Sequence, residues 1–180
     1  DSHGIESHRY IDPEQPKHAL FAHVGPWEEG AIVLSGHTDV VPVDGQDWSS
    51  DPWTVREADG RLFGRGVADM KGFIALALAF VPRFTAGKLP VHLALSYDEE
   101  VGCQGAPSMI ARMAKTIPAP RLAIVGEPSL MGIITGHKGI AVHEVSVRGH
   151  AAHSSLVDHG ISANGVAVRL MHDLLDLSEE

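Results

Sequence analysis

The chain has 180 residues, 44% hydrophobic and 21% charged, which is enough apolar material for one domain, or for one domain and part of another. Its 14 basic and 23 acidic residues give a net charge of −9, which argues against nucleic acid or an anionic membrane as a partner. The single cysteine excludes a disulfide framework and a cysteine-rich zinc site, and the lack of a signal-peptide core or a long apolar run predicts a cytoplasmic protein.

The first part of the chain predicts short strands joined by loops. Residues 1–16 are polar and have no period, so we expect an irregular tail there. Apolar patterns predict strands at residues 18–25 and 31–36, the second ending at His37. Farther on, Asp59-Gly60 lies between two strand-like runs and predicts a hairpin.

From Asp69 the pattern changes to helices that alternate with strands. Apolar residues spaced i, i+3, i+4, i+7 predict a helix that ends before Gly87. Core strands are expected at residues 91–97 and 121–126, with a helix at 107–115 between them. This order indicates an α/β domain with a largely parallel central sheet flanked by helices.

The character of the sequence changes again after His137, so we predict one domain at residues 1–137 and the beginning of a smaller α+β domain at 138–180. Residues 139–149 alternate as a half-buried antiparallel strand does. A loop rich in Gly, His and Ser follows, and then a helix at about 161–177.

Polar residues follow each of the three predicted core strands, at the point where the strand ends. His37 and Asp39 follow the first strand, Glu99 and Glu100 the second, and Glu127 the third. Ligand sites in parallel sheets gather outside the carboxyl ends of the strands. We therefore expect these side chains to share one site.

The residue types indicate a metal centre. An imidazole with several carboxylates suits zinc, cobalt or manganese. Asp39 is spaced to reach His37, whose other nitrogen can then bind a metal, and Asp69 enters a helix where a carboxylate can bridge two cations. Glu99 and Glu100 point in different directions, so one can ligate while the other takes a proton from the attacking water.

Each of these residues also has an ordinary structural interpretation. A histidine at a strand end is often only hydrogen-bonded, Asp69 fits a helix N-cap, and the run from Asp98 to Glu100 fits a solvated turn. All of these interpretations would have to hold together, and they would have to explain why acids follow each apolar strand. A shared site is the more economical hypothesis.

Five segments resemble, in order, the M20-type dinuclear metallopeptidases and deacylases: SGHTDVVPVD, LFGRGVADMKG, LSYDEEVGCQGA, IVGEPS and RGHAAHSS. The resemblance covers nearly everything from His18 onward. It implies a zinc-exopeptidase-like catalytic domain and a smaller lid domain through which two copies form a homodimer. Within the family, the GCQGA segment, the sequence His137-Lys138-Gly139 and the HSS loop favour N-acetylornithine as the substrate over succinyl-diaminopimelate. Another N-acyl amino acid or a small peptide is an alternative substrate.

The resemblance also implies which residues hold the metals. His37 and Glu127 would hold one Zn²⁺, Asp69 would bridge to a second, and Glu100 would hold that second ion. Co²⁺ is an alternative metal. Asp39 would orient the imidazole of His37.

Two further roles follow from the resemblance. Glu99 would be the general base and later the acid, and His153 would donate to the oxyanion of the tetrahedral intermediate. A cis peptide after Asp69 is also implied. Members of this family are much longer and supply a late histidine ligand that this chain lacks, so we expect a fragment of a larger enzyme. A non-catalytic metal-binding or dimerisation fragment is the alternative.

Overall fold

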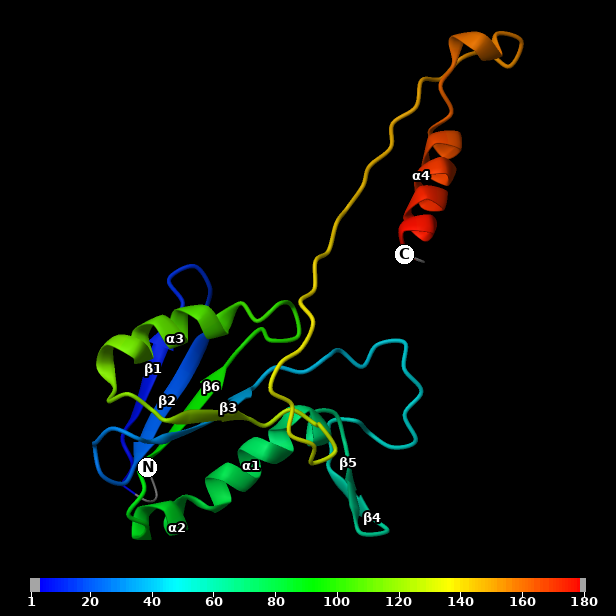
Figure 1. Ribbon diagram of the computed structural model, residues 1–180. Coiled ribbons are helices and arrows are strands. Elements are labelled where there is room, and N and C mark those ends of the chain that lie inside the picture. Colours follow the sequence, from blue (N-terminus) through cyan, green and yellow to red (C-terminus); the bar gives the residue numbers. More distant parts are fainter. Residues whose placement is uncertain (1–3, 179–180) are drawn as a thin grey trace. The chain divides into compact units, whose positions relative to one another are not determined.

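The computed structural model describes residues 4–178, and the chain separates into two compact units, one up to Ile133 and one from Ile134 (Figure 1). The first unit is built on a five-stranded sheet of order β1-β2-β6-β3-β7. β3 pairs in parallel with β6 and β7, whereas β1 and β2 are antiparallel. The α/β class is thus confirmed, and the portion of the sheet that carries the candidate residues is parallel. The strands are β1 (Ser7–Ile11), β2 (His18–Val24), β3 (Ile32–His37), β6 (Val91–Ser96) and β7 (Leu122–Val125).

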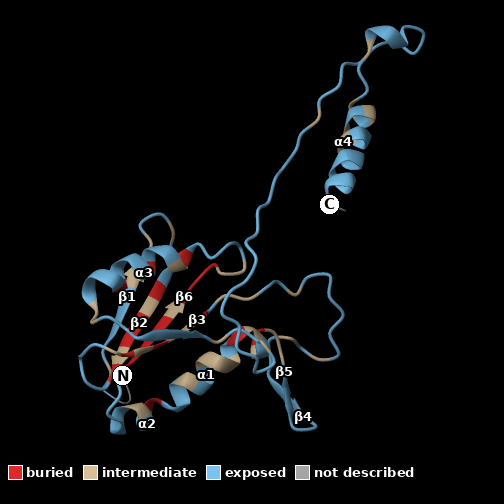
Figure 2. Ribbon diagram, in the orientation of Figure 1, coloured by how far each residue is buried: buried red, intermediate tan, exposed pale blue. Residues whose placement is uncertain are grey.

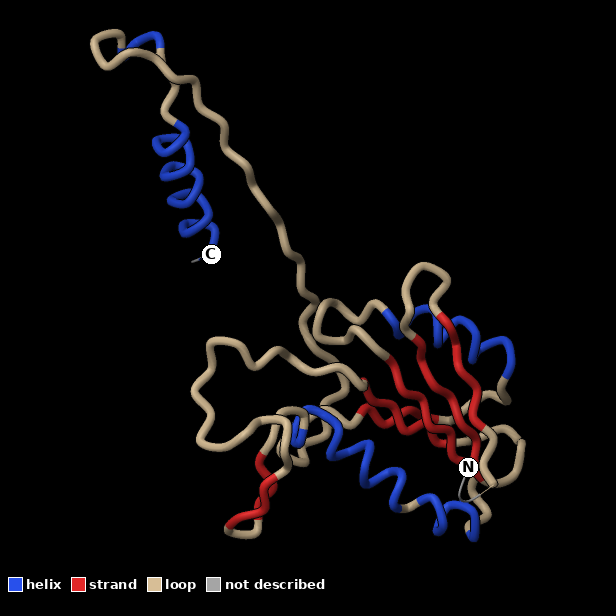
Figure 3. The backbone as a smooth tube through the Cα atoms, turned by 180° about the vertical axis from the view of Figure 1, so that it is seen from behind, coloured by secondary structure: helices blue, strands red, loops and turns tan. Residues whose placement is uncertain are grey.

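Helices cover both faces of this sheet. α3 (Gly105–Thr116) lies on one face, and α1 (Gly72–Ala79) and α2 (Val81–Ala86) lie on the other (Figures 1 and 3). A turn, η1 (Val67–Lys71), leads into α1. The helix predicted after Asp69 is divided in two, because Pro82 at the start of α2 cannot donate a backbone hydrogen bond to the preceding turn.

The core of this unit lies where the sheet meets its helices, and Figure 2 shows buried residues along β2 and β6. Successive residues of a strand point to opposite faces, so these strands supply a cluster on each side. The cluster toward α3 contains Ala19, Phe21, Val33, Ala94, Tyr97, Met109 and Met113. The cluster toward α2 contains Ala22, Val81, Val91 and Leu93.

The expected hairpin is present as β4 (Arg56–Ala58) and β5 (Arg61–Phe63). The expected irregular tail is wrong in part, because residues 7–11 form the edge strand β1, paired with β2 from Ser7 opposite Ala22 onward. Most side chains of β1 are exposed, so the strand carries no apolar alternation in its sequence.

The second unit contains η2 (Val157–His159) and the expected helix, α4 (Ala163–Ser178). The strand predicted at residues 139–149 is wrong: this stretch has no regular structure, and Ile140 is 92% exposed. A strand needs a partner, and the described residues of this unit offer only one bridge, between His150 and Ile161. Among the described helices, none has the length and apolar character that crossing a membrane requires.

Two polar contacts fasten the β1–β2 turn to the end of β6. Lys17 Nζ lies 2.6 and 2.8 Å from the carboxylate oxygens of Asp98, and the Tyr97 hydroxyl donates to Asp12 Oδ2 at 2.7 Å. This hydrogen bond lowers the pKa of Asp12. Asp98 is only 8% exposed, so Lys17 supplies the counter-charge that a buried carboxylate requires. The chain is therefore fixed immediately before Glu99.

Replacing Lys17 with methionine should lower the free energy of unfolding by about 1–2 kcal/mol, because Asp98 would stay buried without its counter-charge. Urea denaturation followed by tryptophan fluorescence measures this change. Lys88→Met is the matched control, since Lys88 is exposed and makes no ion pair with a described residue. Equal losses in the two variants would contradict a stabilising role for the Lys17–Asp98 pair.

A second buried polar group lies in the middle of the sheet. His92 on β6 is 0% exposed, and its Nδ1 lies 3.1 Å from Nδ1 of His23 on β2. His23 Nε2 lies 2.7 Å from the carbonyl of Gly25 and must donate to it, so His23 Nδ1 accepts from His92. Burial, followed by the neighbouring His23, lowers the pKa of His92 to about 4.

Stability should therefore decrease as the pH falls from about 6.5 to about 4, because unfolded His92 binds a proton in this range and folded His92 does not. The loss from this residue is up to about 3 kcal/mol. Urea titrations at several pH values should show that His92→Phe removes this part of the slope, whereas changing the exposed His18 to Phe preserves it. A slope that is unchanged in His92→Phe would contradict this assignment.

Candidate metal centre

The imidazole of His37, the last residue of β3, is 1% exposed and lies among carboxylates. Its Nε2 is 3.0 Å from Asp69 Oδ1, 3.8 Å from Glu127 Oε1 and 3.9 Å from Glu99 Oε2. Its Nδ1 is 3.0 Å from the backbone carbonyl oxygen of Asp39 and 3.4 Å from the Asp39 carboxylate. Because Nδ1 donates to that carbonyl, the lone pair of Nε2 faces the carboxylates. Both are acceptors, so only a proton or a cation between them can bind the nitrogen and the carboxylate oxygens together.

The residues around His37 are shaped to bring Asp69 to it. Met70 is 0% exposed, and its sulfur accepts a hydrogen bond from the backbone N–H of His37 at 3.3 Å. A Cβ at Gly36 would lie 3.0 Å from the Met70 methyl group, so glycine leaves room for this side chain. The Asp69–Met70 peptide is cis, as the family resemblance implies. The N-cap residue of α1 is Lys71, not Asp69, which argues against the N-cap interpretation of Asp69.

Glu127 reaches the same place from β7. The parallel pairing of Ser35 with Val125 continues in a hydrogen bond from the Gly126 N–H to the Ser35 carbonyl, so Glu127 follows at the level of His37. Burial, and then the charge of Asp69, raise the pKa of Glu127. Such crowding of like charges is relieved by a bound cation.

The pKa of His37 is shifted by opposing influences. Burial lowers it, but the hydrogen bond with Asp69, the bond with the Asp39 backbone and the charges of Asp39 and Glu127 outweigh burial. The net result is a raised pKa. The surroundings of His37 thus favour positive charge at Nε2, whether a proton or a metal ion supplies it.

The structure brings together three of the four predicted ligands. One ligand atom each from His37, Asp69 and Glu127 all lie within 4.8 Å of one another. Glu100 contributes its backbone N–H, which donates to Asp39 Oδ2 at 3.1 Å, and its carboxylate is not part of this group. Its role as a ligand to a second cation stays a prediction.

His153 belongs to the second unit. Its Nδ1 accepts a hydrogen bond from the backbone N–H of Ser155 at 3.2 Å and lies 2.8 Å from the Ser155 hydroxyl oxygen. The side chain is exposed. Its contribution to an oxyanion site stays a prediction.

Sequence reasoning missed two contacts behind the centre. The Cys103 thiol donates to Glu99 Oε1 at 3.4 Å, and Lys17 pairs with Asp98 as described above. The four-residue spacing of Glu99 and Cys103 was a usable signal, since a single closed turn brings such residues side by side. Nothing in the sequence connects Lys17 with Asp98, which lie 81 positions apart.

One imidazole with carboxylates around it is a donor set that fits a divalent cation such as zinc.

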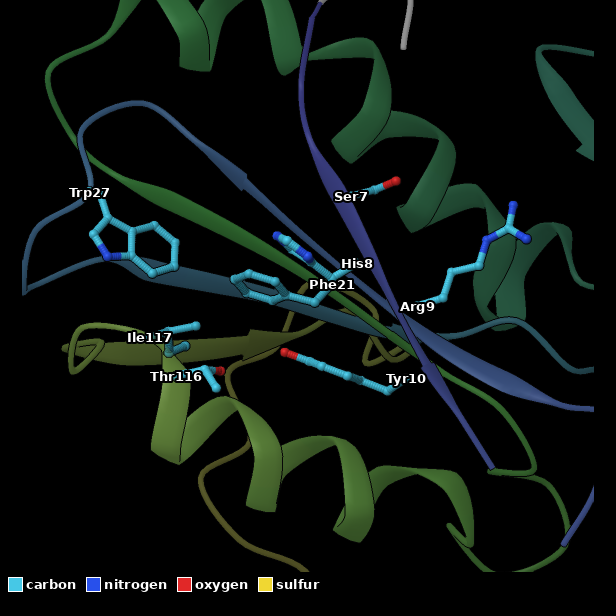
Figure 4. Close-up of a pocket in the computed structure, with 8 residues that line it drawn as sticks. All are labelled: Ser7, His8, Arg9, Tyr10, Phe21, Trp27, Thr116 and Ile117. Carbon is cyan, nitrogen blue, oxygen red and sulfur yellow. The ribbon is translucent and has the colours of Figure 1, made fainter. Parts of the chain in front are cut away.

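A separate hollow of about 580 Å³ lies beside β1, β2 and the end of α3, lined in part by Tyr10, Phe21, Trp27 and Ile117 (Figure 4). It shares no residue with the carboxylate group around His37.

Comparison with solved structures shows that this fold also occurs in two peptidases. The chain superposes on a tripeptidase from Staphylococcus aureus with a TM-score of 0.61 at 16% identity, covering 95% of this chain and 47% of that one. It superposes on human carnosine dipeptidase 1 with a TM-score of 0.58 at 23% identity, covering 68% and 29%. At these identities the likeness shows the fold alone.

Sequence comparison is more specific. The chain is 34% identical over 168 residues to the acetylornithine deacetylases of Buchnera aphidicola subsp. Acyrthosiphon pisum, strains Tuc7 and APS. The match covers 92% of this chain but only 42% of those relatives, so the chain spans less than half of their length. Residues 33–172 match the model of one family, described as peptidase family M20/M25/M40. That match takes in the whole His37 centre, and the chain belongs to peptidase family M20/M25/M40.

Proposed function

We propose that the chain is part of a metal-dependent amidohydrolase that cleaves N-acetylornithine to ornithine and acetate. The observation that carries the proposal is the meeting of His37, Glu99 and Glu127, from the ends of parallel strands, with Asp69 from η1. The 34% identity to acetylornithine deacetylases supports the choice of substrate. The acidic chain also favours a substrate with a free cationic amine.

His37, Asp69 and Glu127 would hold one divalent cation, zinc or cobalt, and Glu100 with Asp69 would hold a second. A divalent cation held by these residues would polarise the amide carbonyl and lower the pKa of a bound water. Asp39 keeps Nδ1 of His37 as a donor through its carbonyl oxygen, which directs the lone pair of Nε2 into the centre.

Glu99 is the proposed general base. Its Oε2 lies 3.9 Å from His37 Nε2, so the carboxylate borders the centre without belonging to the ligand group. Glu99 takes a proton from the water that attacks the amide carbon and passes it to the leaving nitrogen as the C–N bond breaks. His153 is assigned to the negatively charged oxygen that forms in between.

Two other functions fit part of the observations. A different acyl amino acid, such as succinyl-diaminopimelate, or a small peptide would use the same residues. A metal-binding fragment without turnover is favoured by the position of Glu100, whose carboxylate lies outside the ligand group. Metal stoichiometry and turnover separate this candidate from the hydrolase.

Zinc binding should depend on His37. His37→Ala should weaken Zn²⁺ binding about 100-fold or more, since the buried imidazole is the only nitrogen in the ligand group. Isothermal titration calorimetry measures the affinity, and His8→Ala, at a half-exposed histidine outside the group, is the control. Equal zinc affinities in parent and His37→Ala would refute the centre.

The affinity for zinc should also fall with decreasing pH, beginning above the usual histidine range. Protons compete with the metal at His37 and Glu127, whose pKa values are both raised.

Glu99→Gln in the complete, zinc-loaded protein should lower kcat for acetate release from N-acetylornithine by about 10²–10⁴-fold, because a neutral amide cannot accept the proton. The amount of bound zinc should not change, since Glu99 lies outside the ligand group. N-succinyl-diaminopimelate and a dipeptide serve as competing substrates in the same assay. If either one reacts faster, it is the better substrate and N-acetylornithine is wrong. Full activity of Glu99→Gln would show that Glu99 is not the general base.

A further inference from the structure

We propose that Cys103 is a positioning residue for the general base: its thiol holds Oε1 of Glu99 and leaves Oε2 to take the proton. This inference rests on the proposed function of Glu99. Cys103 is the single cysteine of the chain, and its side chain is exposed.

The two oxygens of Glu99 have different neighbours. Oε1 lies 3.4 Å from the Cys103 sulfur, a normal distance for a hydrogen bond donated by a thiol. Oε2 lies 3.9 Å from His37 Nε2, on the side of the ligand group. A carboxylate held at one oxygen rotates less about its terminal bond, so the other oxygen keeps its direction toward the centre.

The backbone places the thiol at this position. The N–H groups of Gly102 and Cys103 both donate to the Glu99 carbonyl at 2.9 Å, which closes a turn. Gly102 has φ 109° and Cys103 has φ 56°, so the turn uses left-handed conformations that bring residue 103 back over residue 99. The next N–H, of Gln104, donates to the carbonyl of Asp98, whose side chain Lys17 holds.

The protonation of the thiol agrees with a donor role. Although Cys103 is exposed, partial desolvation, and then the hydrogen bond and charge of Glu99, raise the pKa of its thiol. The sulfur therefore keeps its hydrogen at neutral pH. This is the opposite of a reactive cysteine, whose neighbours lower its pKa and favour the thiolate.

The contact can be tested in the 180-residue chain without turnover. Iodoacetamide alkylation reports on Cys103 alone, because the chain has no other thiol. Glu99→Gln should speed alkylation severalfold at neutral pH, because the carboxylate that holds the proton on sulfur is gone. Glu100→Gln is the matched control, with the same change in charge one residue away, and should react like the parent. Equal rates in the two variants would overturn the contact.

The positioning role is tested in the complete, zinc-loaded protein with Cys103→Ala and Cys103→Ser. Both replacements carry a Cβ and share the same backbone strain, but only serine keeps a hydrogen-bond donor. Cys103→Ala should lower kcat severalfold with KM unchanged, and Cys103→Ser should restore most of the rate. Equal kcat values for the two variants would overturn the proposal. If the parent releases no acetate, the proposed function fails, and the alkylation rates still decide whether Cys103 holds Glu99.

Discussion

The parallel pairing of β3 between β6 and β7 is the constraint on which the rest of the site depends. In this register His37, the last residue of β3, lies opposite Ser96, the last residue of β6, and β7 ends at Val125, opposite Ser35. The residues that follow them meet at the same edge. A shift of one residue would turn His37 to the other face of the sheet, so packing of the core and assembly of the site are specified together.

The three consecutive acidic residues after β6 make three different contacts. Asp98 faces inward and binds Lys17, which neutralises one charge away from the centre. Glu99 faces the imidazole, and Glu100 offers its backbone N–H to Asp39. Asp39 thereby contacts both the histidine and the turn after β6, so it links the ends of β3 and β6.

Much of this arrangement was predictable because apolar strands and the polar residues after them are local features. β2, β3, β6 and β7 and the meeting of His37 with Asp69 and Glu127 follow from such patterns. β1 was missed because an exposed edge strand has no apolar period, and the strand at 139–149 was predicted wrongly because its period implies a partner that the described residues do not supply. The direction of the Glu100 side chain depends on the turn, which spacing alone does not fix.

Met70 lies directly behind this centre, and its burial has a chemical consequence. Its sulfur is fully enclosed and accepts the N–H of His37, and its methyl group occupies the space over Gly36. Oxidation to the sulfoxide needs an oxidant at the sulfur and adds a polar oxygen to a side chain that is closed to solvent. The folded centre thus shields the Met70 sulfur from oxidants. A sulfoxide at Met70 would mark those molecules in which the centre had opened.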